Sequence, residues 1–334
     1  MRIGLAGTGR IGAFHAATLA GLDEVEQVVV TDTLRGSAAR LADELGCEPA
    51  EDLDELLGRV DGLVITTSTT GHAPTLRRAV AAGVPTFCEK PVATTLAETL
   101  ELVELVEKSG VPVHVGFQRR FDAGYRRARE VVASGELGFV HTIRANTHDQ
   151  SPPPAAYIPT SGGLFRDCSI HDFDIIRFVT GREVTRVFGT GANKGDGFFT
   201  EGGDVDTAAA VLTLDDDTLV LVSATRYNGG GHDVRLEVMG SRGTVGVGYD
   251  DSLAVRSLEA DVDFPRGPQK WSFMERFLPA YRTELVAFCD VVAGRSPSPC
   301  TMTDALEAFR VAEACELSRT SGRPVEVCEI GGAA

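Results

Sequence analysis

Long apolar runs are missing from this sequence of 334 residues. No stretch reaches the roughly 20 apolar residues that a membrane-spanning helix needs. The chain begins directly with a short apolar run of strand length, so we expect no signal peptide. We therefore expect no membrane as a partner.

Paired cysteine motifs are missing as well. The seven cysteines are odd in number and scattered, and no Cys-x-x-Cys pair occurs among them. Neither a disulfide framework nor a structural zinc site is expected, and we expect no metal site. A reducing cytoplasm fits this pattern. The cysteines are Cys47, Cys88, Cys168, Cys289, Cys300, Cys315 and Cys328.

Basic residues are few relative to acidic ones. Lys and Arg number 32 against 48 Asp and Glu, which gives a formal net charge of −16. This surplus disfavours a polyanion such as nucleic acid as the partner. A hydrophobic content of 43% and a charged content of 24% are ordinary for a globular protein. The length suggests two domains.

A glycine-rich turn opens the chain. The apolar run 1–6 predicts a strand, Gly7-Thr8-Gly9-Arg10-Ile11-Gly12 follows at once, and 13–19 predicts a helix. In this context Gly7 permits a tight turn, Gly9 leaves room for a pyrophosphate and Gly12 lets helix and strand pack closely. The helix N-terminus then faces the phosphates with free N–H groups. The alternative is a glycine turn without a ligand.

An acidic residue follows the second predicted strand. This strand covers 27–31 and ends in Asp32, twenty residues after Gly12. A carboxylate there accepts hydrogen bonds from the ribose 2′-hydroxyl and repels a 2′-phosphate, so it favours NAD. Arg35 offers the alternative of receiving that phosphate, which leaves NADP as the second choice.

Strand and helix patterns alternate through the first third of the chain. Predicted strands at 63–66, 84–88 and 111–115 alternate with predicted helices at 72–82 and 96–108. This alternation predicts a parallel, doubly wound sheet with its ligand beyond the carboxyl ends of the strands. Two motifs follow such ends: Thr66-Thr67-Ser68-Thr69-Thr70-Gly71-His72 and Glu89-Lys90-Pro91.

The pattern changes after Gly116, and we place the domain boundary between 118 and 119. Strand-like stretches at 139–147, 184–189, 207–214, 219–226, 234–239 and 243–248 indicate a second α+β domain, 119–334, with a mainly antiparallel sheet. Helices are predicted at 163–179, 280–293 and 303–320. The tail 331–334 is expected to fray.

An acid and a histidine lie four residues apart in the helix predicted at 163–179. On an α-helix, Asp167 and His171 share one face, and the carboxylate raises the pKa of the imidazole. That suits a general base working near neutral pH. The alternative is a surface ion pair, and Asp172 and Asp174 are rival carboxylates. Apolar neighbours give this helix a buried side.

Lys90 follows a central strand, which argues against a solvated loop lysine. Pro91 restricts the turn and is compatible with a cis peptide bond. Glu89 can hold the ammonium or contact the cofactor.

The glycine loop, Glu89-Lys90-Pro91, Gly116-Phe117-Gln118-Arg119-Arg120-Phe121 and the Asp167/His171 pair resemble, in this order, the Gfo/Idh/MocA oxidoreductase family. The resemblance covers essentially the whole chain and is greatest to the inositol dehydrogenases of that family. It implies a Rossmann domain followed by an α+β domain with an open sheet, through which dimers or tetramers associate. One departure is 68–72, where the family often has Pro-Asn-x-x-His.

The resemblance implies NAD-dependent oxidation of a cyclitol or sugar carbinol to a ketone. His171 would remove the hydroxyl proton, Asp167 would orient and stabilise its ring, and Lys90 would hydrogen-bond the same oxygen. Cofactor contacts are expected from Gly7, Gly9, Arg10, Ile11, Gly12, Asp32, Thr67, Ser68, His72, Glu89 and Lys90.

A polyol substrate needs several hydroxyl partners. The candidates are Arg120, His148, Asp149, Tyr157, His232 and Tyr281, each with the alternative of a packing or surface role. Three other functions stay open: a dehydrogenase for another sugar or aminocyclitol, an NAD-using glycosidase, and a cofactor-sensing regulator.

Overall fold

A computed structural model describes residues 1–331 of the chain, which forms two compact units. The first unit holds residues 1–118 and 279–306, and the second holds 119–278 and the described residues from 307 to 331. The sequence-based division assigned 279–306 to the second domain. These residues group with the first unit because the helix that runs from Phe273 to Val292 packs its later turns into the core of that unit.

The first unit is built on a six-stranded parallel sheet with the order β3-β2-β1-β4-β5-β6. Apart from the short edge strand β3, most residues of its strands are buried, as expected for strands covered on both faces. They are β1 (Arg2–Ala6), β2 (Gln27–Thr31), β3 (Glu48–Pro49), β4 (Gly62–Ile65), β5 (Thr86–Glu89) and β6 (Val113–Gly116). The predicted doubly wound sheet is confirmed.

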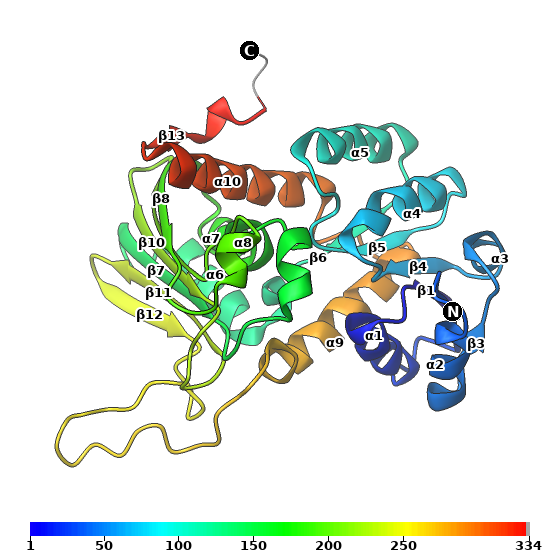
Figure 1. The fold of residues 1–334 in the computed structure, drawn as a ribbon, viewed down its shortest axis with the longest axis horizontal. Coiled ribbons are helices and arrows are strands. Elements are labelled where there is room, and N and C mark those ends of the chain that lie inside the picture. Colours follow the sequence, from blue (N-terminus) through cyan, green and yellow to red (C-terminus); the bar gives the residue numbers. More distant parts are fainter. Residues whose placement is uncertain (332–334) are drawn as a thin grey trace. The chain divides into compact units, whose positions relative to one another are not determined.

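Helices cover both faces of this sheet (Figure 1). They are α1 (Arg10–Ala20), α2 (Ser37–Leu45), α3 (Leu53–Leu57), α4 (Thr69–Ala81) and α5 (Leu96–Ser109). Helices α4 and α5 lie on one face, and α1 and α2 lie on the other together with α9 (Phe273–Val292).

The long helix α9 completes the first core although it comes late in the chain. Leu285 and Phe288 are fully buried with Ile3, Leu5 and Val28 of the first two strands. Burying one such side chain stabilises the fold by about 1.5–3 kcal/mol. Several of these contacts together hold the segment in the first unit.

The second unit is built on a seven-stranded sheet with the order β12-β11-β7-β10-β9-β8-β13. Neighbouring strands are antiparallel except β7 and β10, which are parallel. The strands are β7 (Val140–His148), β8 (Val184–Ala192), β9 (Thr207–Leu214), β10 (Leu219–Thr225), β11 (Asp233–Gly240), β12 (Gly243–Val247) and β13 (Val325–Glu326). The expected mixed, mainly antiparallel sheet is confirmed.

One face of this second sheet is covered by helices and the other is open. Helices α6 (Ala123–Ala133), α7 (Ile170–Thr180) and α10 (Met302–Ser321) lie on the covered side (Figure 1). The open side carries exposed apolar residues because side chains alternate between faces along each strand. These residues include Phe188, Val211 and Leu221, each 43% exposed.

Short elements complete the second unit: α8 (Phe198–Glu201) and the short helical turns Gln118–Phe121, Ala155–Thr160 and Val327–Glu329. The segment Phe165–Ser169 forms a π-helical turn directly before α7. Within residues 1–331, no helix has the length and apolar character to cross a membrane.

Candidate active site

The glycine loop joins β1 to α1 at the carboxyl edge of the first sheet. Gly7 has φ +99°, and a Cβ there would lie 2.5 Å from the backbone nitrogen of Thr67. A Cβ on Gly12 would lie 1.8 Å from the carbonyl oxygen of Gly7, so both positions require glycine. A Cβ on Gly9 would meet no atom within 4 Å, so the space beside the loop is open.

Helix α1 begins with Arg10 and Ile11, and its N-cap residue Gly9 provides no side-chain cap. The first N–H groups of a helix have no partner within it and carry its positive partial charge. An uncapped helix start beside an open loop therefore fits the phosphates of a dinucleotide.

Asp32 follows β2 and fastens this loop. Its Oδ2 accepts hydrogen bonds from the backbone N–H of Thr8 at 2.6 Å and from the Thr8 hydroxyl at 2.8 Å. Its Oδ1 accepts from the backbone N–H of Leu34 at 2.7 Å. Burial acts to raise the pKa of Asp32, but these hydrogen bonds outweigh it and lower the pKa. Arg35 is exposed.

The motif after β4 places a histidine between two backbone segments. Nδ1 of His72 lies 2.7 Å from the carbonyl oxygen of Pro91, and Nε2 lies 3.1 Å from that of Thr67. Burial lowers the pKa of His72, while the two carbonyls act in the opposite direction. His72 is 2% exposed and its ring links two loops, and the cofactor contact predicted for it stays a prediction. Ser68 is exposed at the start of α4.

The motif after β5 has a second buried histidine behind it. Oε1 of Glu89 lies 2.6 Å from Nε2 of His15, whose side chain is fully buried on α1. The Lys90–Pro91 peptide bond is cis, as the proline suggested. Lys90 is half-buried. His15 therefore fixes the residue that precedes the proposed catalytic lysine.

In the second unit, the predicted acid and base lie on either side of a change in helix type. Asp167 is within the π-helical turn and His171 is in the first turn of α7. A π-helical turn bonds i to i+5 and is wider than an α-helical one, so the expected α-helical spacing of this pair does not hold. Such turns are frequent at functional sites. Both side chains are half-buried.

Both oxygens of Asp167 accept hydrogen bonds. The Tyr157 hydroxyl donates to Oδ1 at 3.0 Å, and Nη2 of Arg226 donates to Oδ2 at 2.6 Å. Arg226 also donates from Nη1 to Oδ2 of Asp149 at 2.9 Å. Tyr157 is 41% exposed, whereas Arg226 is 4% exposed. Tyr157 thus lies beside Asp167, and the substrate role predicted for it stays a prediction.

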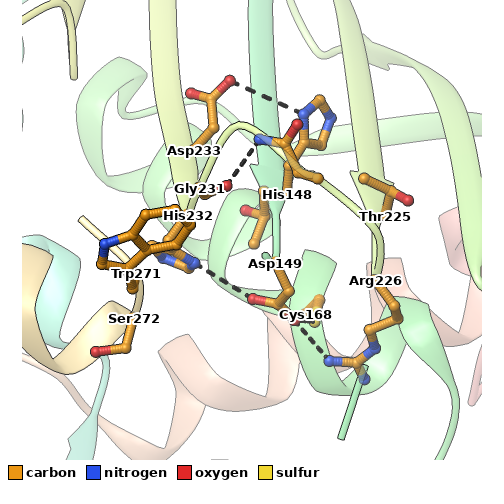
Figure 2. Close-up of polar contacts among 12 residues, drawn as sticks. His148, Asp149, Cys168, Thr225, Arg226, Gly231, His232, Asp233, Trp271 and Ser272 are labelled. Carbon is orange, nitrogen blue, oxygen red and sulfur yellow. Dashed lines mark hydrogen bonds and ion pairs between the residues drawn. The ribbon is translucent and has the colours of Figure 1, made fainter. Parts of the chain in front are cut away.

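Asp149 lies between two cationic or polar side chains. Figure 2 shows its carboxylate between the His232 ring and the Arg226 guanidinium. The distance from Oδ1 to Nδ1 of His232 is 3.4 Å. Burial acts to raise the pKa of Asp149, but His232 and Arg226 lower it well below the usual range. Asp149 and His232 therefore serve an internal network, and the substrate roles predicted for them stay predictions.

His148 projects from the opposite face of β7. It lines a groove on the open side of the sheet with Arg144 and Asn146, the alternate residues of the strand. Its Nε2 lies 2.9 Å from the Ser223 hydroxyl, and burial lowers its pKa. The period-two alternation of a strand separates it from Asp149, so the structure does not bring His148 to Asp167.

Two other substrate candidates have structural partners. Arg120 is buried and donates from Nε and Nη2 to the Asp174 carboxylate on α7. The neighbouring Arg119 donates from Nη1 to Oδ1 of Asp172 at 2.6 Å. Asp172 and Asp174, the two rival carboxylates of α7, therefore hold this helix in place.

Tyr281, the last substrate candidate, belongs to the first unit. Its ring centroid lies 5.1 Å from that of Phe14, and the residue is 6% exposed.

Comparison with known proteins gives two family matches along the chain. Residues 1–117 match the family described as oxidoreductase family, NAD-binding Rossmann fold, and residues 125–246 match the GFO/IDH/MocA C-terminal domain. The chain belongs to the Gfo/Idh/MocA family of oxidoreductases. The predicted family and the NAD-binding Rossmann domain are therefore confirmed.

Named members of the Gfo/Idh/MocA family align over nearly the whole chain. A myo-inositol dehydrogenase from Streptomyces leeuwenhoekii, Hyg17, is 40% identical and covers 96% of this chain and 98% of its own length. The scyllo-inositol 2-dehydrogenase (NAD(+)) of Bacillus subtilis is 36% identical, and the alignment covers 98% of this chain and 96% of the length of that enzyme. The crystal structure of a scyllo-inositol dehydrogenase from Lactobacillus casei with bound NAD(H) and scyllo-inositol superposes with a TM-score of 0.88 at 28% identity. The superposition covers 98% of this chain and 99% of that one.

Sequence reasoning missed His15 and Arg226 in this family member. Arg226 ends a predicted strand, and its partners Asp149 and Asp167 are 77 and 59 residues away along the chain. The only local signal was a single basic residue at the end of an apolar strand. His15 lies 74 residues from Glu89 and likewise has no local signature.

Proposed function

We propose that this protein is an NAD-dependent cyclitol dehydrogenase that oxidises one ring carbinol of an inositol to a ketone. The observation that carries the proposal is the near full-length similarity to inositol dehydrogenases, including one solved with NAD(H) and scyllo-inositol. myo-Inositol is the first candidate substrate, oxidised at carbon 2, and scyllo-inositol is the second.

The residues of the first unit that we propose for NAD binding fit a dinucleotide. The open space at Gly9 and the uncapped start of α1 accommodate a pyrophosphate, with Arg10 and Ile11 in the first turn. Asp32 retains acceptor capacity for the ribose hydroxyls and disfavours a 2′-phosphate. Thr67, Ser68 and the Glu89–Lys90 turn lie at the same edge of the sheet. NAD, when bound, supplies the hydride acceptor.

We propose a separate task for each catalytic residue. His171 accepts the proton of the substrate hydroxyl as the general base, a role that contributes about 10²–10⁴-fold in rate. Asp167 stabilises the imidazolium that results. The ammonium of Lys90 donates a hydrogen bond to the carbinol oxygen and favours its developing negative charge. His72 and His15 position the turn that carries Lys90.

We further propose that the protein is a cytoplasmic homo-oligomer, a tetramer or dimer, that associates through the open face of the second sheet. Apolar side chains are exposed along three neighbouring strands of that face: Phe188, Val211 and Leu221. A contiguous exposed apolar surface of this kind is typical of a protein–protein interface. The reducing cytoplasm is the compartment that suits seven free cysteines.

Absorbance of NADH tests the proposed activity directly. The purified protein is mixed with NAD or NADP and with myo-inositol, scyllo-inositol, an aminocyclitol or common sugars. We expect NADH formation with an inositol and NAD. Glycoside cleavage without net NADH would point to the glycosidase alternative, and NAD binding without turnover of any substrate would point to a regulator.

A further inference from the structure

A buried arginine outside every motif contacts the acid of the proposed acid–base pair. Arg226 is 4% exposed and donates to Oδ2 of Asp167 at 2.6 Å. We infer that Arg226 is a positioning residue that orients the Asp167 carboxylate and keeps it ionised, so that Asp167 can support His171 as the base. This inference rests on the function proposed above and adds a residue to its site.

Two adjacent strand ends fix the place of Arg226. Strands β7 and β10 are parallel neighbours with His148 opposite Thr225. Asp149 and Arg226 directly follow these two strands, and the N–H of Asp149 donates to the carbonyl of Thr225 at 2.9 Å. Both side chains therefore project to the same face of the sheet, opposite to the open groove.

The guanidinium is held at both ends of its fork. Nη1 donates to Asp149 and Nη2 donates to Asp167, so the planar group cannot turn without losing a charged hydrogen bond. Asp149 is fixed in turn by Nδ1 of His232 at 3.4 Å and by the Cys168 thiol at 3.5 Å (Figure 2). The backbone N–H of His232 donates to the carbonyl of Lys270 at 2.8 Å. Arg226 thus links the Asp167 carboxylate to a set of side chains that are themselves held by hydrogen bonds.

The surrounding charges keep this arrangement ionised. Burial acts to lower the pKa of Arg226, but the neighbouring Cys168, Asp167 and Asp149 raise it well above its ordinary value. A guanidinium that stays charged at a carboxylate favours the ionised form of that carboxylate. An ionised Asp167 is the form that stabilises an imidazolium.

Two donors hold the carboxylate of Asp167, one at each oxygen. Tyr157 donates to Oδ1 and Arg226 donates to Oδ2. Each carboxylate oxygen has about two acceptor sites, so neither of these hydrogen bonds by itself prevents a further one. Burial and the charge of Asp167 raise the pKa of Tyr157, which keeps its hydroxyl a donor. Rotating the carboxylate would break both contacts, so its orientation is fixed.

Arg226→Gln tests the inference because it removes the cation and keeps a polar side chain. We expect kcat with the inositol substrate to fall about 10–100-fold, since a displacement of about 1 Å at a catalytic group costs about 100-fold. The Kd for NAD and the KM for inositol should change less than about threefold. Arg177→Gln is the matched control, because it breaks an arginine–carboxylate pair between Arg177 on α7 and Glu183 beyond the end of that helix. This control should keep the wild-type kcat.

A double-mutant cycle separates positioning from general stability. If Arg226 acts through Asp167, Asp167→Asn combined with Arg226→Gln should have the kcat of Asp167→Asn alone. Multiplied losses in the double variant, or a wild-type kcat for Arg226→Gln, would overturn the inference and leave the proposed function standing. A wild type that makes no NADH with any cyclitol would overturn the proposed function itself and the inference with it.

A second variant keeps the test available if Arg226→Gln does not fold. Arg226→Lys retains the charge but cannot reach both carboxylates as a fork. Its kcat should be lowered with an unchanged Kd for NAD, whereas a wild-type kcat would overturn the inference.

Discussion

Asp32 carries out a structural and a binding task with one carboxylate. It accepts three hydrogen bonds from Thr8 and Leu34, which order the glycine loop. Its lowered pKa keeps it ionised, and the same negative charge repels a 2′-phosphate. The preference for NAD and the shape of the loop therefore depend on the same side chain.

Asp32→Ala is expected to reduce the preference for NAD over NADP. The ratio of kcat/KM values for the two cofactors should fall by about tenfold or more, which corresponds to about 1.4 kcal/mol. Asp61→Ala is the control: Asp61 also accepts a backbone N–H, from Arg2 at 2.8 Å, but at the amino end of the sheet. A wild type that already prefers NADP would contradict the role assigned to Asp32.

For single residues, the sequence predicted well the features that depend on adjacent residues, and poorly the contacts between residues far apart in the chain. The glycine loop and the turn at Lys90–Pro91 could be predicted because each is marked by a pattern of adjacent residues in the chain. The partners of Arg226 could not, because they come from other elements. The face on which His148 lies could not be assigned either, since the register of β7 was not known to one residue.

At the scale of elements, α7 is held in place by buried ion pairs. Arg119 pairs with Asp172, and Arg120 pairs with Asp174. The sequence predicted one helix over 163–179, whereas the structure has a π-helical turn at Phe165–Ser169 before α7. The spacing of apolar residues indicates which positions of a helix are buried. It does not indicate which carbonyl group each backbone N–H bonds, so it could not reveal this π-helical turn.

The ends of β7 and β10 should be linked by a pH-dependent contact. The pKa of Asp149 is lowered in the folded protein, so its ionised form contributes stability above the ordinary Asp pKa of about 3.9. That contribution is lost as the pH falls toward the folded pKa. At pH 7, Asp149→Asn should lower stability by about 1–3 kcal/mol, seen as a lower urea midpoint.

The gap in urea midpoint between wild type and Asp149→Asn should narrow as the pH falls below about 4. Glu183→Gln is the control, since it removes a largely exposed partner of Arg177 and should cost under about 1 kcal/mol. A gap that stays constant down to pH 3 would contradict the assigned role of Asp149.

At the scale of the whole molecule, the alternation of strands and helices was enough to predict the fold class. The family and the NAD-binding Rossmann domain were also predicted from motifs and their order. The grouping of residues 279–306 with the first unit could not be predicted, because the apolar face of a helix does not indicate in which of two hydrophobic cores it packs. Leu285 and Phe288 decide that in the structure.

Association through the open sheet face predicts that a charge there disrupts the oligomer. Leu221→Glu introduces a carboxylate at a 43% exposed position in the middle of the face. We expect size-exclusion chromatography with light scattering to show a smaller species than the wild type. Leu317→Glu, at a 37% exposed position on α10, should leave the size unchanged. A monomeric wild type, or an unchanged size for Leu221→Glu, would contradict the proposed interface.

The most direct test of the proposed mechanism measures turnover and NAD binding in the variant His171→Ala. With inositol and NAD, we predict that kcat falls by about 10²–10⁴-fold, while the Kd for NAD stays within about threefold of the wild type. His141→Ala, an exposed histidine on β7, should change neither quantity. Equal losses of turnover and NAD binding in His171→Ala, or no loss of turnover, would contradict the assignment of His171 as the base.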